Sequence, residues 1–361
     1  MPPVEVWEKV LLGEESFFDS VHGRENCIIC HGGTGEVDDK EAAHEGMVRD
    51  PDATQACASC HGDTVEAQAG SLHQNLQGFL TVLADRSDDE HMPQVLEAYE
   101  THCASCHATC GQCHVSRPTN VGGGLLAGHE FKGTPPMSLT CTGCHGSRIN
   151  DEYKGQNEGV PADVHWNPGG MPCFACHTAE EMHGELGDAE HRYDGPPTPS
   201  CTADGCHAEV LTGDGVEHHT GVHLERLSCQ VCHSTDYKNC YNCHVQRTED
   251  GTPFFRTDES QMMVRIGLNP IQSPDRPWEY VVVRHVPISR DSFEYYGEDL
   301  LPNFDNRPTW TYATPHSIQR NTPQNAACDS CHGNETLFLT EDDVDPDELE
   351  ANRDVIVRQV P

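Results

Sequence analysis

Twenty cysteines form ten pairs along the chain, and a histidine directly follows the second cysteine of every pair. Nine pairs have the spacing Cys-x-x-Cys-His, whereas residues 201–207 read CTADGCH and hold four intervening residues. This pattern is typical of covalent attachment of a c-type haem, in which each thiol forms a thioether and the histidine binds the iron. We number the motifs 1 to 10 in chain order and expect ten haem c groups as cofactors.

The expected thioether residues are Cys27, Cys30, Cys57, Cys60, Cys103, Cys106, Cys110, Cys113, Cys141, Cys144, Cys173, Cys176, Cys201, Cys206, Cys229, Cys232, Cys240, Cys243, Cys328 and Cys331. The expected proximal iron ligands are His31, His61, His107, His114, His145, His177, His207, His233, His244 and His332. Motifs 3 and 4 are separated by only two residues, so their haems should be close neighbours.

Disulfides and structural zinc are the alternatives for so many cysteines. Zinc also uses paired cysteines, but it requires no histidine next to the second one. Histidine is only 24 of 361 residues, so chance does not place it after all ten pairs. The sequence therefore favours haem over both alternatives.

The second axial ligand of each iron decides whether a haem only passes electrons or also binds substrate. Fourteen histidines lie outside the motifs, which is four more than ten bis-histidine haems need. The ten that we expect to be distal ligands are His22, His44, His73, His129, His165, His183, His191, His223, His285 and His316. His219 and His102 rank next, and His91 and His218 look most like spare residues. A distal histidine can also come from another subunit.

The composition leaves little material for an ordinary core. Hydrophobic residues make up 35% and aromatic residues 6% of the chain, and the mean hydropathy is −0.61. Ten haems would leave about 36 residues for each (361 divided by ten), so we expect the haems themselves to fill the interior. The net charge of −37 argues against nucleic acid and anionic lipid as partners and favours cations or basic proteins. No stretch predicts insertion into a membrane.

The elements that position the motifs are expected to be short. The fold class is a multihaem cytochrome c, with irregular loops and short helices wrapped round a haem chain and a small β element within 262–288. We expect helices over 71–86, with Ser71 and Gln74 as a capping box, and from Pro93 to near motif 3. Strands are expected at 262–267 and 279–288, a helix start at Asp345–Glu348, and either an edge strand or a disordered tail at 355–361.

We expect three regions along the chain: residues 1–245 with nine motifs, residues 246–327 without a motif but supplying distal histidines, and residues 328–361 with motif 10 and an acidic tail. The acidic runs at 36–41 and 340–350 do not match the spacing of an EF-hand, so we read them as solvated surface.

Four stretches, CASCHATCGQCHVSRP (103–118), GSRINDEYKG (146–155), PADVHW (161–166) and TPQNAACDSCHG (322–333), resemble the multihaem c-type cytochromes of anaerobic respiration. They are similar to proteins related to the octahaem tetrathionate reductase group and to surface-exposed electron-transfer cytochromes. The resemblance implies a periplasmic or extracellular location, and some surface cytochromes of this kind polymerise into conducting filaments. Reductases of the group often carry a Cys-x-x-Cys-Lys haem, which this sequence lacks. The CTADGCH variant resembles a motif of tetrahaem cytochromes from sulfate reducers.

We therefore expect an electron-transfer protein with ten mainly bis-histidine haems, which acts in anaerobic or extracellular respiration. Its expected partners are redox proteins or extracellular electron acceptors, with self-assembly into filaments as a further possibility. The alternatives are a reductase of small nitrogen or sulfur oxyanions with one open haem, and a haem-storage protein. The chain start shows no signal peptide, so one is expected to be removed on export. No catalytic residue is predicted.

Overall fold

A computed structural model of the chain describes residue 5 and residues 15–106, 108–184, 189–194 and 198–361. The chain divides into two compact units built from alternating segments. Unit 1 comprises residues 1–79, 104–144 and 173–198, and unit 2 comprises residues 80–103, 145–172 and 199–361. Each unit combines segments that lie far apart in the sequence, whereas the three regions that we expected describe the distribution of the motifs along the chain.

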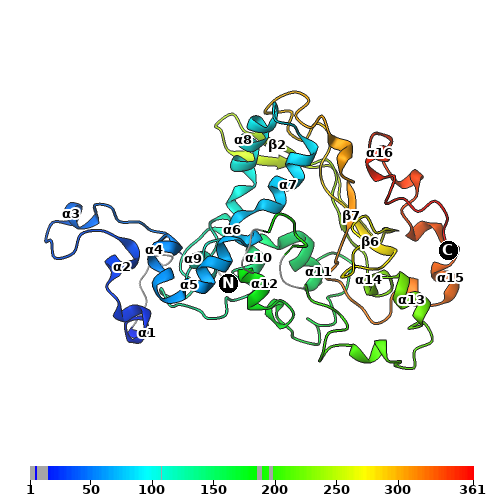
Figure 1. The fold of residues 1–361 in the computed structure, drawn as a ribbon, viewed down its shortest axis with the longest axis horizontal. Coiled ribbons are helices and arrows are strands. Elements are labelled where there is room, and N and C mark those ends of the chain that lie inside the picture. The colour runs from blue at the N-terminus through cyan, green and yellow to red at the C-terminus, as the bar shows by residue number, and fades with distance from the viewer. Residues whose placement is uncertain (1–4, 6–14, 107, 185–188, 195–197) are drawn as a thin grey trace. The chain divides into compact units, whose positions relative to one another are not determined.

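Unit 1 consists of short helices joined by loops (Figure 1). Its helices are α1 (Glu15–Asp19), α2 (Cys27–His31), α3 (Lys40–His44), α4 (Ala53–Ala56), α5 (Ala58–Ala69), α6 (Leu72–Asn75), α9 (Cys110–His114), α10 (Cys141–Cys144) and α12 (Ala179–His183). Helices α2, α9 and α10 contain cysteine motifs, and Asn26 and Thr109 cap the first two through their side chains. Each of these three motifs thus occupies about one helical turn, which brings its two sulfurs to the same side.

The helix expected over 71–86 is interrupted. Leu76 has a φ of 50°, in the left-handed region, and separates α6 from α7 (Gln77–Arg86). The expected capping box is absent, because the Ser71 hydroxyl donates to the Gln68 carbonyl and the Gln74 side chain accepts from that of Gln68. These two local hydrogen bonds compete with the capping interaction.

Unit 2 holds most of the regular structure. Its helices are most of α7, α8 (Met92–His102), α11 (Asp151–Tyr153), α13 (Gly221–Arg226), α14 (Cys229–His233), α15 (Cys328–Cys331) and α16 (Leu349–Asn352). Its strands are β1 (Tyr237–Asn239), β2 (His244–Arg247), β3 (Pro253–Arg256), β4 (Gln261–Met263), β5 (Ile266–Leu268), β6 (Tyr280–His285) and β7 (Trp310–Tyr312). The helix expected from Pro93 is confirmed, with Pro93 in its first turn.

Three small antiparallel sheets organise unit 2: β1–β4, β2–β3 and β5–β6–β7. The two expected strands are present, but the first is split, since β4 pairs with β1 whereas β5 pairs with β6. Strand β6 is buried along its whole length, as its run of valines predicts. Figure 1 shows β6 and β7 side by side.

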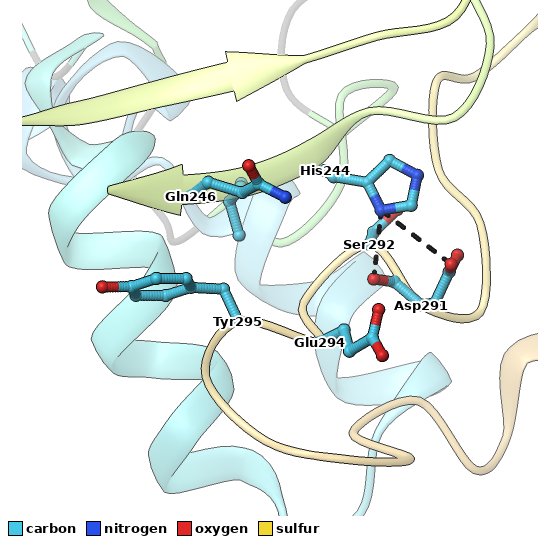
Figure 2. A pocket seen from close by; sticks show the side chains of 7 residues that line it. His244, Gln246, Asp291, Ser292, Glu294 and Tyr295 are labelled. Carbon is cyan, nitrogen blue, oxygen red and sulfur yellow. Dashed lines mark hydrogen bonds and ion pairs between the residues drawn. The ribbon is translucent and has the colours of Figure 1, made fainter. Parts of the chain in front are cut away.

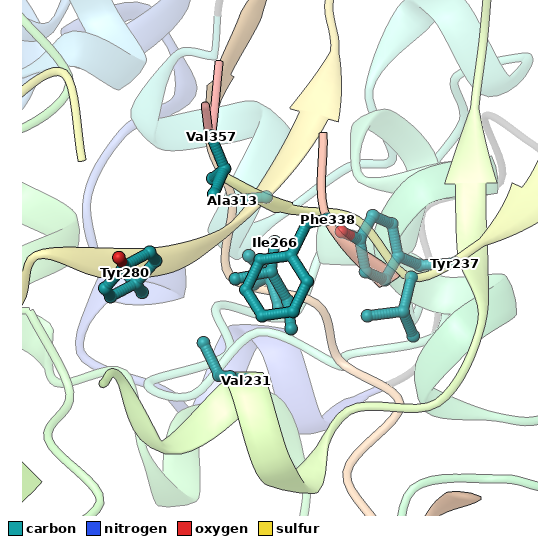
Figure 3. Packing of buried hydrophobic residues seen from close by; sticks show 9 residues of the cluster. Val231, Tyr237, Ile266, Tyr280, Ala313, Phe338 and Val357 are labelled. Atoms are coloured by element: carbon teal, nitrogen blue, oxygen red, sulfur yellow. The ribbon is translucent and has the colours of Figure 1, made fainter. Parts of the chain in front are cut away.

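An apolar core lies against these strands (Figure 3). Its buried members are Val231, Tyr237, Val264, Ile266, Tyr280, Val282, Ala313, Phe338 and Val357. The C-terminal segment belongs to this core, because Val355, Ile356 and Val357 are buried and the Val355 carbonyl accepts from the Leu268 amide at 2.8 Å. Residues 355–357 are therefore an integral part of the fold rather than a disordered tail.

Unit 1 has far less apolar interior. Among the described residues its buried hydrophobic side chains are Phe17, Val65, Leu76 and Met137, and all the others belong to unit 2. The polypeptide exposes 21021 Å² to solvent, whereas a compact monomer of 39.8 kDa is expected to expose about 14,000 Å². The polypeptide by itself therefore buries much less surface than its size predicts, and the deficit in apolar core is concentrated in unit 1.

Candidate functional site: cysteines and paired imidazoles

The twenty cysteines all lie in the described part of the chain, and none of them forms a disulfide there. None is buried, although cysteine is among the residue types that are most often buried in proteins. The hydrophobic residues within the motifs behave in the same way, since Ile29 and Phe174 are about half exposed. The motifs therefore present sulfur and apolar surface outward from the polypeptide, which is what attachment of a large apolar group requires.

Six motif histidines each face one histidine from outside the motifs. The ring centres are separated by 5.8 to 6.2 Å in all six cases. The pairs, with the motif residue first, are His31–His129 (5.8 Å), His61–His22 (6.2 Å), His114–His183 (6.1 Å), His207–His165 (6.2 Å), His233–His219 (6.0 Å) and His332–His223 (6.1 Å).

This separation matches the distance expected for two imidazoles on opposite sides of one metal ion. A metal–imidazole bond is about 2.0–2.1 Å, and each nitrogen is about 1 Å from its ring centre, so trans rings have centres about 6 Å apart. Rings in van der Waals contact come closer, as Phe131 does to His22 with centres 3.8 Å apart. The separation of the ring centres in the six pairs would therefore accommodate one metal ion between the two rings.

Six of these twelve rings donate a hydrogen bond from Nδ1, which leaves Nε2 as the nitrogen available to a metal ion. Each acceptor is a carbonyl or carboxylate oxygen, so Nδ1 carries the proton and the Nε2 lone pair is available. The six bonds join His31 to Val48 O (2.8 Å), His114 to Lys132 O (2.6 Å), His165 to Asp163 Oδ1 (2.8 Å), His219 to Asp214 Oδ2 (2.6 Å), His223 to His218 O (2.9 Å) and His233 to Gln319 O (3.0 Å).

The surroundings of the non-motif rings also influence their charge. Burial lowers the pKa of His22, His129 and His183, which favours the neutral form that binds metal. His165 is the exception, because its hydrogen bond to Asp163 raises its pKa. That carboxylate makes the imidazole a stronger electron donor, so it would lower the reduction potential of a bound iron.

The remaining motif histidines differ from these six. His177 donates Nδ1 to Glu181 at 3.0 Å. Burial lowers the pKa of His73, and the charges of Glu181 and His177 act on the same ring with opposite effects, so His73 lies near both residues. His107 lies outside the described residues. His145 precedes the π-helical turn η4 (Gly146–Asn150). Among the described residues no imidazole faces His244 at the separation of the six pairs.

The expected distal ligands therefore fall into two groups. His22, His129, His165, His183 and His223 are paired with a motif histidine, and His73 lies near one. His44 is exposed on α3 and donates Nδ1 to the Lys40 carbonyl at 2.6 Å. The ring of His191 lies 5.8 Å from Tyr193, and that of His316 lies 6.3 Å from Tyr153.

His285 differs from its expected role. It is 1% exposed, its Nδ1 donates to the Cys240 carbonyl at 2.8 Å, and its Nε2 lies 2.9 Å from Glu348 Oε2. Its ring also stacks on Tyr241 with centres 4.4 Å apart. Both nitrogens are therefore used within the protein, and the structure supports a structural role for this residue instead of ligation.

His219, which the sequence ranked below the ten candidates, is paired with His233. The signal that could have identified it is the acidic residue five positions earlier, since Asp214 accepts its Nδ1 hydrogen. The adjacent His218 offers only its backbone carbonyl, to His223. Three of the six paired non-motif histidines, His165, His219 and His223, have an acidic or carbonyl acceptor at Nδ1. His44 and His91 have such an acceptor as well, so this feature alone does not identify the paired histidines.

Sulfurs of different motifs lie next to each other within each unit. In unit 1, Cys144 is hydrogen-bonded to Cys106, which lowers its pKa to about 6, and the Asn120 amide donates to Cys144 Sγ at 3.4 Å. In unit 2, Cys201 lies against Cys229. The side chains of Thr322 and Asn325 donate to the Cys232 carbonyl. The turn η8 (Pro323–Asn325), which follows Thr322, packs against α15. Groups attached to these sulfurs would be neighbours.

A pocket of about 170 Å³ lies beside His244 (Figure 2). Its lining includes the side chains of Gln246, Asp291, Glu294 and Tyr295, and His244 Nδ1 is 3.3 Å from the Asp291 carbonyl oxygen. Two carboxylates in so small a space make the pocket electronegative. It therefore suits a cation or a neutral molecule better than an anion.

Within the described ranges, no group of three or more His, Cys, Asp or Glu side chains converges as a metal site. No helix there has the length and apolar character needed to cross a bilayer. Comparisons with protein-family models, with curated proteins and with solved structures give no match for this chain.

Proposed function

We propose that the protein transfers electrons through ten covalently attached haem c groups, most of them with two histidine ligands. The observation that carries the proposal is the set of six imidazole pairs with centres 5.8 to 6.2 Å apart, each of which contains the histidine of a Cys-Cys-His motif. When bound, the haems supply reversible one-electron chemistry at iron.

The chain's own residues perform three tasks in this proposal. The paired cysteines would attach each macrocycle, and the paired imidazoles would be the two iron ligands, which would keep substrate from the iron. The neighbouring sulfurs of Cys106 and Cys144, from motifs 3 and 5, and of Cys201 and Cys229, from motifs 7 and 8, would hold their macrocycles close enough for electrons to pass. Imidazole ligation without methionine and a strongly acidic surface both stabilise the ferric state and so keep the potentials low.

A pyridine haemochrome assay combined with the intact mass tests the proposal. We expect ten haems per chain, and an oxidised spectrum dominated by low-spin ferric iron. A haem count far below ten per chain would refute the whole proposal. Ten haems with a large high-spin fraction would instead overturn the bis-histidine assignment and would leave the attachment chemistry in place.

Covalent attachment of haem takes place after export in prokaryotes, so the proposed location is the cell surface or the extracellular space, or otherwise the periplasm. Assembly into a filament is the finer part of the proposal. His44 supports it, because its Nδ1 is satisfied by Lys40 while the ring is exposed, as a ligand for an iron of a neighbouring copy would be. The net charge of −37 opposes self-association unless salt screens it. Electron microscopy at physiological salt, with only monomers visible, would refute this part alone.

A reductase with one open haem is the second candidate, and His244 is the observation in its favour, since no described imidazole pairs with it. The pocket beside His244 could admit a small molecule, and Tyr295 could donate a proton. Asp291 and Glu294 would repel nitrite or tetrathionate, however, so electron transfer remains the better-supported function. Turnover of nitrite, hydroxylamine or tetrathionate by the purified protein would reverse this order.

A further inference from the structure

The segment His129–Lys132 contacts three of the proposed haem sites in unit 1. The ring of Phe131 stacks on His22 with centres 3.8 Å apart and planes at 10°. It also meets His129 edge-on with centres 5.8 Å apart. Because His22 pairs with His61 of motif 2 and His129 pairs with His31 of motif 1, one phenyl ring touches the partner histidines of two motifs.

The next residue extends these contacts to a third motif. The Lys132 carbonyl accepts the Nδ1 hydrogen of His114, the histidine of motif 4, at 2.6 Å. The segment itself is held in place by Glu130, whose carboxylate binds Lys132 Nζ at 2.5 Å and accepts from the Ser16 hydroxyl at 2.8 Å.

The backbone of the segment is strained at the ligand. His129 has a φ of 73°, in the left-handed region that non-glycine residues rarely adopt. Such a conformation persists only where the surroundings impose it, and it tends to occur at functional sites. Phe17, which packs edge-on against His129 with centres 4.7 Å apart, is one of the surrounding contacts.

We propose that residues 129–132 join the haems of motifs 1, 2 and 4 into one cluster, in which Phe131 is a positioning residue that sets the imidazole planes of His22 and His129. This inference rests on the proposed haem function. It accounts for the nearly parallel planes of His22 and His61, at 21°, because Phe131 lies parallel to His22 and prevents its rotation.

The test compares the holoprotein variants Phe131→Leu and Phe79→Leu. Phe79 is a matched control, since it is an exposed phenylalanine of unit 1 that makes no ring contact among the described residues. The readouts are the haem count, the low-spin EPR spectrum and a spectroscopic redox titration. For Phe131→Leu we expect ten haems, altered g values for two of them and shifted potentials for the same two. Phe79→Leu should match the parent protein, and Phe131→Tyr should restore its spectrum.

An unchanged EPR spectrum in Phe131→Leu with ten haems present would overturn this inference and leave the electron-transfer proposal intact. A change spread evenly over all ten haems would also overturn it. If Phe131→Leu loses haem through misfolding, Phe131→Met, whose unbranched and flexible side chain fills irregular gaps, serves as the second variant. Absence of haem from the parent protein would refute the proposed function itself, so the two failures are distinguishable.

Discussion

The imidazole of His219 faces that of His233 with ring centres 6.0 Å apart, while its neighbour His218 faces no motif histidine among the described residues. Adjacent residues of the same type thus have different roles. Asp214 accepts the Nδ1 hydrogen of His219, which leaves Nε2 as the nitrogen available to a metal ion.

The first prediction follows from this pair. His219→Ala should leave the motif 8 iron with one ligand and convert one haem in ten from low-spin to high-spin. His218→Ala should retain the parent spectrum, because only the backbone carbonyl of His218 is used, by His223. EPR and visible spectra of the ferric protein measure this. Equal high-spin signals from both variants would show that the loop, rather than the His219 ring, is responsible.

The second prediction concerns the shapes of the EPR signals. When the two imidazole planes are nearly parallel, the two iron d orbitals that interact with them differ in energy. When the planes are crossed, the energies of these two orbitals are nearly equal. His61–His22 and His114–His183, at 21° and 25°, should therefore give rhombic low-spin signals. His31–His129, His207–His165 and His233–His219, at 56° to 64°, should give highly anisotropic signals with a large g maximum. A spectrum with a single rhombic species would contradict these geometries.

The third prediction concerns the carboxylate behind His219. Asp214→Asn keeps an oxygen for the Val216 amide but removes the charge that strengthens the imidazole as a donor. The potential of one haem should rise by about 60–120 mV, since such second-shell partners change metal affinity about 10–100-fold and a tenfold change corresponds to 59 mV for one electron. A redox titration measures the shift. Glu217→Gln, an exposed charge change in the same loop, is the control and should leave all the potentials unchanged.

The fourth prediction tests whether His285 stabilises the fold or binds an iron. His285→Ala removes the hydrogen bonds to Glu348 and to the Cys240 carbonyl, so the free energy of unfolding should fall by about 1–3 kcal/mol. Denaturant unfolding followed by circular dichroism measures this change. No new high-spin haem should appear in the native variant. A high-spin signal from one haem would restore His285 to the ligand set that the sequence predicted.

The fifth prediction concerns protein produced without haem. Unit 2 contains the core around Ile266, Val282 and Phe338, whereas unit 1 buries few hydrophobic side chains. Protease should therefore cleave the unit 1 segments first and leave a resistant fragment from within residues 227–357. Mass spectrometry of a limited digest identifies the sites. Uniform digestion of both units would show that the unit 2 core does not fold without the cofactor.

The strands of unit 2 show which features of the fold can be predicted from the local sequence pattern. The valine run of β6 predicts a buried strand, because apolar β-branched residues in sequence leave no polar face. The pairing of β1 with β4, and the inclusion of residues 355–357 in the core, depend on contacts between distant segments. Local pattern therefore located the elements but did not identify their partners.

The sequence by itself determined the ten cysteine–histidine motifs and the first ligand expected for each, because attachment chemistry requires those residues within one turn of backbone. It did not determine the second ligand. His223 and His332 are 109 residues apart (332 minus 223), and His31 and His129 are 98 apart (129 minus 31), yet their rings face each other. Only the tertiary structure decides such pairs, because long-range packing brings the two rings together, and distant acceptors such as the Gln319 carbonyl for His233 determine which ring nitrogen stays available.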